Sequence, residues 1–432
     1  MPQITVIADD LSGAAETAEQ FRLRGHETAV SLGVPTGPLV PVTVVDLGTR
    51  AGTAEEARVA IDALPLSPGA LVLKKTDSLW RGHVGPELEA LAARGYDVVV
   101  AGALPALGRT VVDGRPLVDG RPLAETSLWH LEPRPAPGVL AELVDQPSVL
   151  VGLDVVRSGP SAFAGCLDDA LVGGPLVLVD AETDDDVAAV VAAVLRLAAR
   201  PGARRPVALA GSAALAAALA DAVEPTTRPG GDPAVGEGVD RPTSADAGPR
   251  GWTGPERPVL VVVGSAAEVA RGHVDVLAAT GADVHVLDPA AAVGDLVGAT
   301  RASLARSPLA VVTVTGRRLP DPLAAATTLA EVVARVAGAE AVDLVLTGGE
   351  TARAVLDRLA TTSLRPLAQV EHGAVLSATA DDRLVATKPG SFGGPTVLAD
   401  LVDLVRRTRT GVDPHDLAAS AASGAPTKRR TP

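Results

Sequence analysis

The segment ITVIADDLSG at positions 4–13 decides the fold of the first half of the chain. Its apolar, β-branched part, Ile4 to Ala8, predicts a buried strand. The small residues that follow predict a helix from Gly13 to Arg24, which Gly25 ends. A strand that passes through an acidic turn into a helix is the first half of a βαβ unit, and such units build parallel sheets covered by helices.

The same alternation continues to about residue 223. Further strands are predicted at Thr28–Leu32, Val42–Asp46, Leu71–Lys75, Val98–Ala101, Val149–Leu153, Leu176–Val179 and Val207–Leu209. Helices are predicted at Ala54–Leu64, Pro86–Ala93, Thr183–Ala199 and Ser212–Val223. One stretch differs, because Asp113-Gly114 and Asp119-Gly120 are hairpin-turn signals; residues 110–125 are therefore predicted to form an antiparallel excursion.

A segment rich in proline and glycine, residues 224–257, has no periodic apolar pattern and is predicted to be a linker or long surface loop. After it the alternation restarts, with strands at Val259–Val263, Val284–Leu287, Leu309–Thr313 and Leu344–Leu346. Helices are expected near residues 267–279, 322–336, 350–359 and 395–407. We therefore expect two α/β domains with largely parallel sheets, over residues 1–223 and 258–409, and a disordered tail over residues 410–432.

The composition favours a globular protein that acts on a small molecule. The 432 residues are 47% hydrophobic, enough for sizeable cores, while 2% aromatic residues argue against an aromatic RNA-binding platform. A net charge of −14 argues against a nucleic-acid or anionic-membrane surface, since both need a cationic field. With one cysteine, no signal-peptide pattern and no apolar run of about 20 residues, a cytoplasmic protein is expected. A homo-oligomer stays open.

Charged residues gather where two predicted strands of the first domain end, and the carboxyl ends of parallel strands are where such sheets carry chemistry. Asp9 and Asp10 suit hydrogen bonds to substrate hydroxyls, metal binding or proton transfer; alternatively, one of them caps the helix. The segment KKTDSLWRG, residues 74–82, places two lysines at a buried strand end, where they need an anionic substrate or an internal partner such as Asp77. Arg81 offers a planar fork for a carboxylate or phosphate.

Glycine-rich turns take the corresponding places in the second domain. They are Gly264-Ser265, LTGGETA at residues 346–352 and KPGSFGGP at residues 388–395. Backbone N–H groups at such turns can bind phosphates, although each turn alone is also compatible with an ordinary tight turn, and Gly211-Ser212 of the first domain has the same pattern. No Walker A motif is present. A charged pocket in one domain and an anion-binding face in the other fit a two-domain kinase that uses ATP and Mg²⁺.

Six motifs in order resemble the four-carbon acid sugar kinase family, over almost the whole chain from Ile4 to about Val405. They are ADDLSG at 8–13, KKTDS with Arg81-Gly82, Gly108-Arg109-Thr110 leading to Asp113-Gly114, Gly264-Ser265, TGGETA at 347–352 and KPGSFG at 388–393. The resemblance implies that the N-terminal domain binds the acid sugar, that the C-terminal domain binds ATP, and that the active site lies in the cleft between them. It also implies transfer to the terminal 4-hydroxyl of a threonate, erythronate or 3-oxo-tetronate type of substrate.

Position by position, the resemblance places Asp9, Asp10, Lys75, Asp77, Ser78 and Arg81 in the sugar-binding motifs. It places Ser265, Gly348, Gly349, Glu350, Thr351, Gly390 and Gly393 in the nucleotide-binding motifs. Arg81 and a lysine are expected to bind the substrate carboxylate, and Asp10 or Asp77 to orient or deprotonate the hydroxyl. No metal-ligating residue is assigned.

The chain departs from the family pattern at two places on the sugar side. It has Ala14-Ala15-Glu16 where Ala-Asn-Asp is more usual, and Leu79-Trp80 where Thr-Leu is usual. A bulky Trp80 near the pocket is expected to alter the size preference. Two alternatives remain: an ATP-dependent kinase of another small hydroxy-acid, and a non-catalytic sugar-acid sensor.

Overall fold

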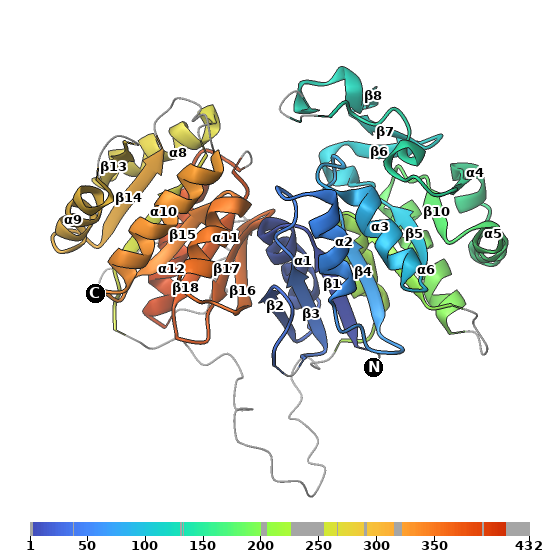
Figure 1. Cartoon of the computed structure of the whole chain (residues 1–432), viewed down its shortest axis with the longest axis horizontal. Helices are drawn as coiled ribbons and strands as arrows, with labels where there is room; N and C mark the ends of the chain where they lie inside the picture. The colour runs from blue at the N-terminus through green and yellow to red at the C-terminus, as the bar shows by residue number, and fades with distance from the viewer. Residues whose placement is uncertain are drawn as a thin grey trace, which may run out of the picture. The chain divides into compact units, whose positions relative to one another are not determined.

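A computed structural model describes residues 3–37, 39–129, 132, 134–199, 205–225, 255–265, 267–288, 292–314, 322–390 and 393–411. It divides the chain into two compact units, Met1–Thr226 (unit 1) and Thr227–Pro432 (unit 2), which are described one at a time (Figure 1). Most of the predicted linker and nearly all of the predicted tail lie outside the described residues. Those two assignments stay predictions.

Unit 1 contains an eight-stranded parallel sheet in the order β2-β3-β1-β4-β11-β5-β10-β9. Its strands are β1 (Ile4–Ala8), β2 (Thr28–Leu32), β3 (Val42–Asp46), β4 (Leu71–Lys75), β5 (Asp97–Ala101), β9 (Val149–Val151), β10 (Leu176–Val179) and β11 (Val207–Gly211). Every residue of β1 and β3 is buried, so helices cover both faces of the sheet. The predicted parallel α/β architecture is confirmed.

Two groups of helices cover this sheet. In one group, α1 (Leu11–Leu23), α7 (Ala213–Ala222), α6 (Asp184–Ala198) and α5 (Pro160–Gly173) pack in that order; in the other, α2 (Ala54–Asp62) packs on α3 (Val84–Ala93). Neither α5 nor the short helix α4 (Leu153–Val156) was predicted from the sequence, and the strand predicted to reach Leu153 ends at Val151. Gly152 instead ends the strand and serves as the N-cap of α4.

The predicted antiparallel excursion is confirmed as a three-stranded sheet of β6 (Arg109–Val112), β7 (Arg115–Val118) and β8 (Arg121–Pro122). Asp113 and Gly114 have φ values of 51° and 69°, as a two-residue hairpin turn of this kind requires. The Asp180 carboxylate, just after β10, accepts hydrogen bonds from both of these N–H groups, at 2.7 and 2.9 Å. This contact fastens the excursion to the end of the main sheet.

Unit 2 contains a seven-stranded sheet in the order β13-β14-β12-β15-β18-β17-β16. Its strands are β12 (Val259–Val263), β13 (Asp283–Leu287), β14 (Leu309–Val314), β15 (Asp343–Thr347), β16 (Ser363–Glu371), β17 (Ala374–Ala378) and β18 (Leu384–Lys388). The first five strands in the order are parallel, and β17 and β16 are antiparallel additions that the sequence analysis missed. The helices are α8 (Glu268–Ala279), α9 (Val293–Leu304), α10 (Pro322–Ala337), α11 (Gly349–Arg358) and α12 (Val397–Arg409).

Each sheet has a topological switch point, where the chain leaves two adjacent parallel strands in opposite directions. In unit 1 these strands are β1, followed by β2 on one side, and β4, followed by β5 on the other. In unit 2 they are β12, followed by β13, and β15, followed by β16. Ligands of open α/β sheets bind beyond the carboxyl ends of such strand pairs. The acidic turn and the glycine turns of the sequence occupy these two places.

Candidate active site

The two aspartates after β1 have different surroundings. Asp10 is the N-cap of α1, with its Oδ1 accepting a hydrogen bond from the Gly13 N–H at 3.0 Å, and it keeps partial exposure. Asp9 is 1% exposed, so it is not a solvated turn residue. The backbone of Gly82 lies so close that a Cβ there would sit 2.8 Å from Asp9 Oδ2.

Arg50 joins three carboxylates and was not among the predicted site residues. It follows β3, and its Nε and Nη2 donate to the two oxygens of Asp9 at 2.7 and 2.8 Å. Its Nη1 lies 2.9 Å from Asp10 Oδ2 and 3.6 Å from Asp77 Oδ2. The only signal for it in the sequence is its place shortly after a predicted strand, and that signal does not distinguish it from other loop arginines.

Asp77 is held by the segment that follows β4. The Arg81 guanidinium donates two hydrogen bonds to it, from Nε to Oδ1 at 3.0 Å and from Nη2 to Oδ2 at 2.7 Å. The N–H of Leu79 donates to the same carboxylate at 2.9 Å. The structure thus brings Asp9, Asp10, Asp77 and Arg81 together in one array through Arg50.

Both lysines at the end of β4 pair with internal carboxylates, although not with Asp77. Lys74 Nζ lies 3.0 Å from Glu87 Oε2, and both side chains are fully buried. Lys75 Nζ lies 3.2 Å from Glu16 Oε2 and donates to the Thr76 carbonyl. The departure at Glu16 therefore falls inside the charged array.

Ser78 contacts a charged residue next to the array, whereas Trp80 lies in the hydrophobic core. Ser78 Oγ accepts a hydrogen bond from Arg109 Nη1, which brings β6 to the array. Trp80 is 2% exposed and belongs to the hydrophobic core, where a Cβ on Gly102 would lie 2.2 Å from its ring. The expectation that Trp80 acts on substrate size from the pocket wall is not supported by this buried position.

Burial and neighbouring charges separate the proton affinities of the carboxylates. Burial raises the pKa of Asp10 above its ordinary value, and the negative charge of Asp9 adds to this against the opposing cations of Arg50 and Lys75. At Asp9 and Asp77, burial is outweighed by Arg50, which holds the pKa of both below the ordinary range, with Arg81 adding to the effect at Asp77. Burial raises the pKa of Glu87 to about 7.

In unit 2 the glycine turns converge at the ends of β12, β15 and β18. A Cβ on Gly390 would lie 3.4 Å from Ser265 Cβ and 3.6 Å from Gly348 Cα. A Cβ on Gly264 would lie 1.9 Å from Thr351 Oγ1, so only glycine allows this approach. Gly348 has φ 85° and precedes α11 without a side-chain cap, and a Cβ there would meet nothing within 4 Å. The space beside Gly348, just before the start of α11, is therefore open.

The other predicted residues of unit 2 lie around these turns. Gly349 and the exposed Glu350 form the first turn of α11, and the Thr351 side chain is buried. The Thr347 hydroxyl is buried and has no hydrogen-bond partner among the described residues. In the first domain, by contrast, Ser212 Oγ donates to the Ala103 carbonyl at 2.5 Å, so the similar turn there serves packing.

Lys388, at the end of β18, is 2% exposed, and its Nζ donates to the Pro389 carbonyl at 2.6 Å. Burial lowers its pKa to about 8, against the opposing charge of Glu371. The Glu371 carboxylate accepts hydrogen bonds from the Gly394 N–H at 3.0 and 3.1 Å. At Gly393, with φ 109°, a Cβ would lie 2.4 Å from Glu371 Oε1 and 2.9 Å from Lys388 Cε. Ser391 and Phe392 lie outside the described residues.

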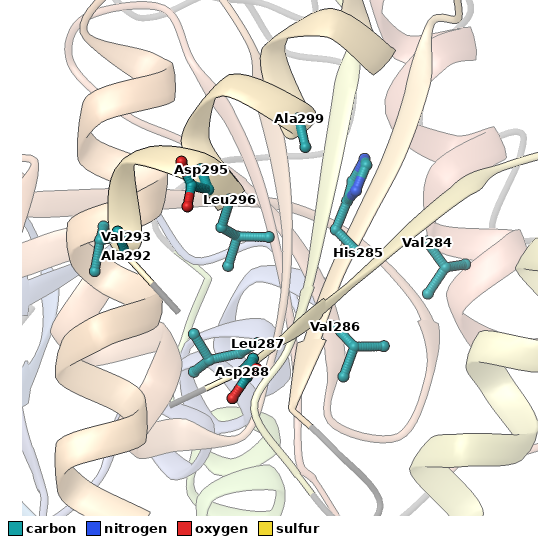
Figure 2. A pocket seen from close by; sticks show the side chains of 10 residues that line it. All are labelled: Val284, His285, Val286, Leu287, Asp288, Ala292, Val293, Asp295, Leu296 and Ala299. Carbon is teal, nitrogen blue, oxygen red and sulfur yellow. The ribbon is translucent and has the colours of Figure 1, made fainter. Parts of the chain in front are cut away.

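A separate cavity of about 310 Å³ lies between the edge strand β13 and α9 (Figure 2). His285 and Leu287 line it from β13, and Asp295 and Leu296 from α9. None of the predicted site residues lines this cavity. Across the described ranges, no group of three or more His, Cys, Asp or Glu side chains is placed to hold a metal ion.

Family models match both units. Residues 4–219 match a sugar-binding N-terminal domain and residues 260–398 a nucleotide-binding C-terminal domain. A D-threonate kinase of Cupriavidus necator is 32% identical over 91% of this chain and 95% of its own length. The chain belongs to the four-carbon acid sugar kinase family. The resemblance carried by the six motifs is confirmed.

Other similar proteins of the family have different named substrates. A D-threonate kinase of Salmonella typhimurium is 29% identical over 95% of this chain and its own full length. A 3-oxo-tetronate kinase of Methylobacterium radiotolerans is 28% identical over 92% of this chain and 98% of its own length. Family membership thus makes this protein a sugar-acid kinase, while the named substrates of its relatives differ.

Solved structures show the same fold for this sugar-acid kinase. A crystal structure from Salmonella typhimurium LT2 has a TM-score of 0.71 at 22% identity, covering 92% of this chain and 98% of that one. HI1011 of Haemophilus influenzae has a TM-score of 0.66 at 20% identity, covering 95% of this chain and all of that one. In the described part of the kinase, no helix has the length and apolar character that a membrane span requires.

Proposed function

We propose that this kinase uses ATP to phosphorylate the terminal 4-hydroxyl of a four-carbon acid sugar of the threonate, erythronate or 3-oxo-tetronate type. The observation that carries the proposal is the array at the switch point of unit 1, in which Arg50 and Arg81 alternate with Asp9, Asp10 and Asp77. A polyhydroxylated acid needs both kinds of partner. Guanidinium groups bind its carboxylate, and carboxylates accept hydrogen bonds from its hydroxyls.

For the substrate carboxylate we propose Arg81, with Arg109 and Ser78 beside it. Arg81 is the more exposed cation, with 27% of its side chain exposed, while Lys75 is 6% exposed and already paired with Glu16. We keep Lys75 as a second, more distant charge. Glu16 stands where the family more often has aspartate. Through its ion pair with Lys75, it would affect the charge that faces the acid sugar.

Asp10 is the better of the two candidates for the catalytic base. It is the more exposed carboxylate, at 14% against 8% for Asp77, and its raised pKa gives it the higher affinity for a proton. Asp77 has a strongly lowered pKa, and Arg81 occupies both of its oxygens. In the reaction, the proton of the substrate hydroxyl passes to Asp10 as the hydroxyl oxygen bonds to the γ-phosphorus, and ADP leaves. Asp77 holds the arginines, and Asp9 holds Arg50.

For ATP we propose the converging turns of unit 2. Ser265, Gly348, Gly349, Thr351, Gly390 and Gly393 offer backbone or hydroxyl groups around the open start of α11. Phosphates bind readily at such helix N-termini. The unpartnered Thr347 hydroxyl and the buried Lys388 ammonium border the same place. In-line transfer requires that these turns and the array of unit 1 act on one pair of substrates.

Mg²⁺ fits this arrangement as a companion of the nucleotide. Magnesium sites in kinases usually combine one or two protein carboxylates with phosphate oxygens and waters. The exposed Glu350, in the first turn of α11, would be a carboxylate ligand for it, because Glu371 already accepts hydrogen bonds from the Gly394 N–H. When bound, Mg²⁺ supplies neutralisation of the charge that develops on the phosphates.

A panel of acid sugars tests the proposal. D- and L-threonate, the erythronates, 3-oxo-tetronates and other small hydroxy-acids are offered with ATP and Mg²⁺, ADP release is followed by a coupled assay, and phosphorus NMR locates the phosphate. Turnover of a four-carbon acid with phosphate on the terminal hydroxyl is expected. Turnover of other hydroxy-acids alone would favour the first alternative, and ligand binding without ADP release would favour the sensor.

A further inference from the structure

Arg50 has the geometry of an organising group. All three nitrogens of its guanidinium contact carboxylates. Nε and Nη2 contact Asp9, and Nη1 contacts Asp10 and Asp77. The loop after β3 is itself held in place, because the Arg50 N–H donates to the Asp9 carbonyl at 3.1 Å. Arg50 therefore lies between the ends of β1 and β4, which are the two strands of the switch point.

The space around Arg50 is built closely. Gly82, with φ 81°, passes so near that a Cβ would lie 2.8 Å from Asp9 Oδ2 and 3.5 Å from Arg50 Cγ. The neighbouring loop residue Thr49 donates from Oγ1 to Glu87 Oε1 at 3.2 Å, which links the loop to the buried Lys74–Glu87 pair. Backbone and side chains from three segments thus fix the guanidinium.

We propose that Arg50 is the positioning residue of the acid-sugar site: it holds Asp9, Asp10 and Asp77 in one array and keeps Asp10 in the charged form that accepts the substrate proton. The inference rests on the proposed function, because it assigns Arg50 its effect through Asp10. It goes further by giving a role to a residue outside the motifs that identify the family.

The charges that face Asp10 explain why this cation matters. Asp9 lies beside it on the chain, Lys75 approaches from β4 with Glu16 of α1 as its partner, and Arg50 approaches from the loop after β3. Asp77 acts on the same guanidinium, while Lys74 and its partner Glu87 interact with Asp9. Burial and the charge of Asp9 raise the pKa of Asp10, and Arg50, Lys75 and the Gly13 N–H lower it. Without Arg50, only Lys75 and the Gly13 N–H of these groups still lower it. The pKa of Asp10 should then rise.

Lysine cannot replace Arg50 in this arrangement. A lysine ammonium is a single point charge, whereas the guanidinium fork binds Asp9 with two nitrogens and still reaches Asp10 with the third. Arg50→Lys should therefore keep a positive charge but lose the fixed array. Arg50→Gln removes the charge as well. The two variants separate position from charge.

The test is the pH profile of kcat/KM for the wild type, Arg50→Lys and Arg50→Gln. The acid limb should move to higher pH in Arg50→Gln, and less far in Arg50→Lys. Activity at a pH below the limb should then fall about tenfold for every pH unit by which the limb moves, and it should partly return at higher pH. Arg157→Gln is the matched control, because Arg157 also grips an aspartate of unit 1 with two nitrogens, Asp186 at 2.9 and 2.8 Å, away from the array. Its profile should keep the wild-type limb.

A second measurement follows Asp10 itself and does not need turnover. Carboxyl-carbon NMR of aspartate-labelled protein, assigned with Asp10→Asn, gives the titration of Asp10 in the wild type and in each folded variant. An Asp10 titration and an acid limb that do not move in Arg50→Gln overturn the inference, even where the wild type phosphorylates acid sugars. A wild type that turns over no acid sugar refutes the proposed function instead, while the Asp10 titration still shows whether Arg50 controls this carboxylate.

Discussion

The two switch points of this kinase are built from different materials. At the switch point of unit 1 the chain places five carboxylates against five cations, almost all through side-chain contacts: Asp9, Asp10, Glu16, Asp77 and Glu87 with Arg50, Lys74, Lys75, Arg81 and Arg109. At the switch point of unit 2 the groups that meet are glycine backbones, with Lys388 as the buried cation beside them. Under the proposed function, the first site would bind the acid sugar through charged side chains and the second would bind ATP through backbone amides.

The ligands proposed for the two sites account for this difference. An acid sugar has a carboxylate at one end and hydroxyls along its length, and several side chains with fixed geometry are needed to distinguish such groups. A triphosphate presents oxygens of one charge, which backbone amides at a helix start can bind without side chains. Substitutions in unit 1 should therefore act on proton transfer and charge balance, whereas those in unit 2 should act on close approach.

The largest effect is expected from the carboxylates of unit 1. Asp10→Asn should lower kcat by about 10²- to 10⁴-fold, because it removes the proton acceptor. Asp77→Asn should act mainly on KM for the acid sugar, because it frees Arg81 and weakens the hold on Arg50. Steady-state kinetics with both substrates varied separates the two. Equal losses of kcat in both variants would contradict the assignment of Asp10 as the base. A near-normal kcat in both variants would show that neither aspartate is the base.

The second largest effect is on stability, at the buried pair next to the array. At a pH above about 7, where Glu87 is charged, Lys74→Met should lower the free energy of unfolding by about 3–5 kcal/mol, because it leaves this carboxylate buried without its cationic partner. Lys74→Met with Glu87→Gln should recover most of this loss. Arg301→Met breaks the exposed Arg301–Glu340 pair of unit 2 as a control, which should cost less than about 1 kcal/mol.

The pH dependence of stability gives the same pair a second test. Burial raises the pKa of Glu87 to about 7 from an ordinary 4.5, so its contribution to stability is complete below pH 4.5 and is lost as pH rises through about 7. Glu87→Gln should remove this part of the pH dependence. Urea unfolding at several pH values across this range gives the free energy of unfolding as a function of pH. If that dependence is the same in Glu87→Gln as in the wild type, Glu87 does not titrate there.

A third effect tests the close approach in unit 2. Gly264→Ala should raise KM for ATP and cost about 1–3 kcal/mol of stability, because its Cβ would lie 1.9 Å from Thr351 Oγ1 and the turn must shift. KM for the acid sugar should stay the same. Gly272→Ala, in α8 with nothing within 4 Å, should instead stabilise by about 0.5–1 kcal/mol. A Gly264→Ala variant with a normal KM for ATP would show that ATP binding does not depend on the close approach of Gly264 to Thr351.

The same contrast explains what the sequence could predict. Both parallel sheets and the hairpin excursion follow from local patterns, and so do the glycine turns, because a turn and the helix after it are neighbours in sequence. The charged partners in unit 1 are not neighbours in sequence. Arg50 lies about forty positions from Asp9, the carboxylate it binds, and neither Lys74 nor Lys75 forms the predicted ion pair with Asp77. The β16–β17 hairpin was missed because Pro366 interrupts the alternating residues of β16, and β17 is a short run of small and apolar residues without alternation.

The smallest effect separates the two sites by pH. Burial lowers the pKa of Lys388 to about 8, so its side chain is charged below that pH and loses its charge as pH rises above it. KM for ATP should therefore rise at alkaline pH, by at most about tenfold, since the ammonium also donates to the Pro389 carbonyl. Lys388→Met should have the high KM at every pH. Arg50 does not titrate in this range, so it should cause no loss of activity at alkaline pH. Under the proposed function, the protonation of Asp10 should instead lower activity at acid pH. A wild-type KM for ATP that is flat through pH 8, with a flat Lys388→Met beside it at the same value, would show that the cation of unit 2 does not reach the nucleotide.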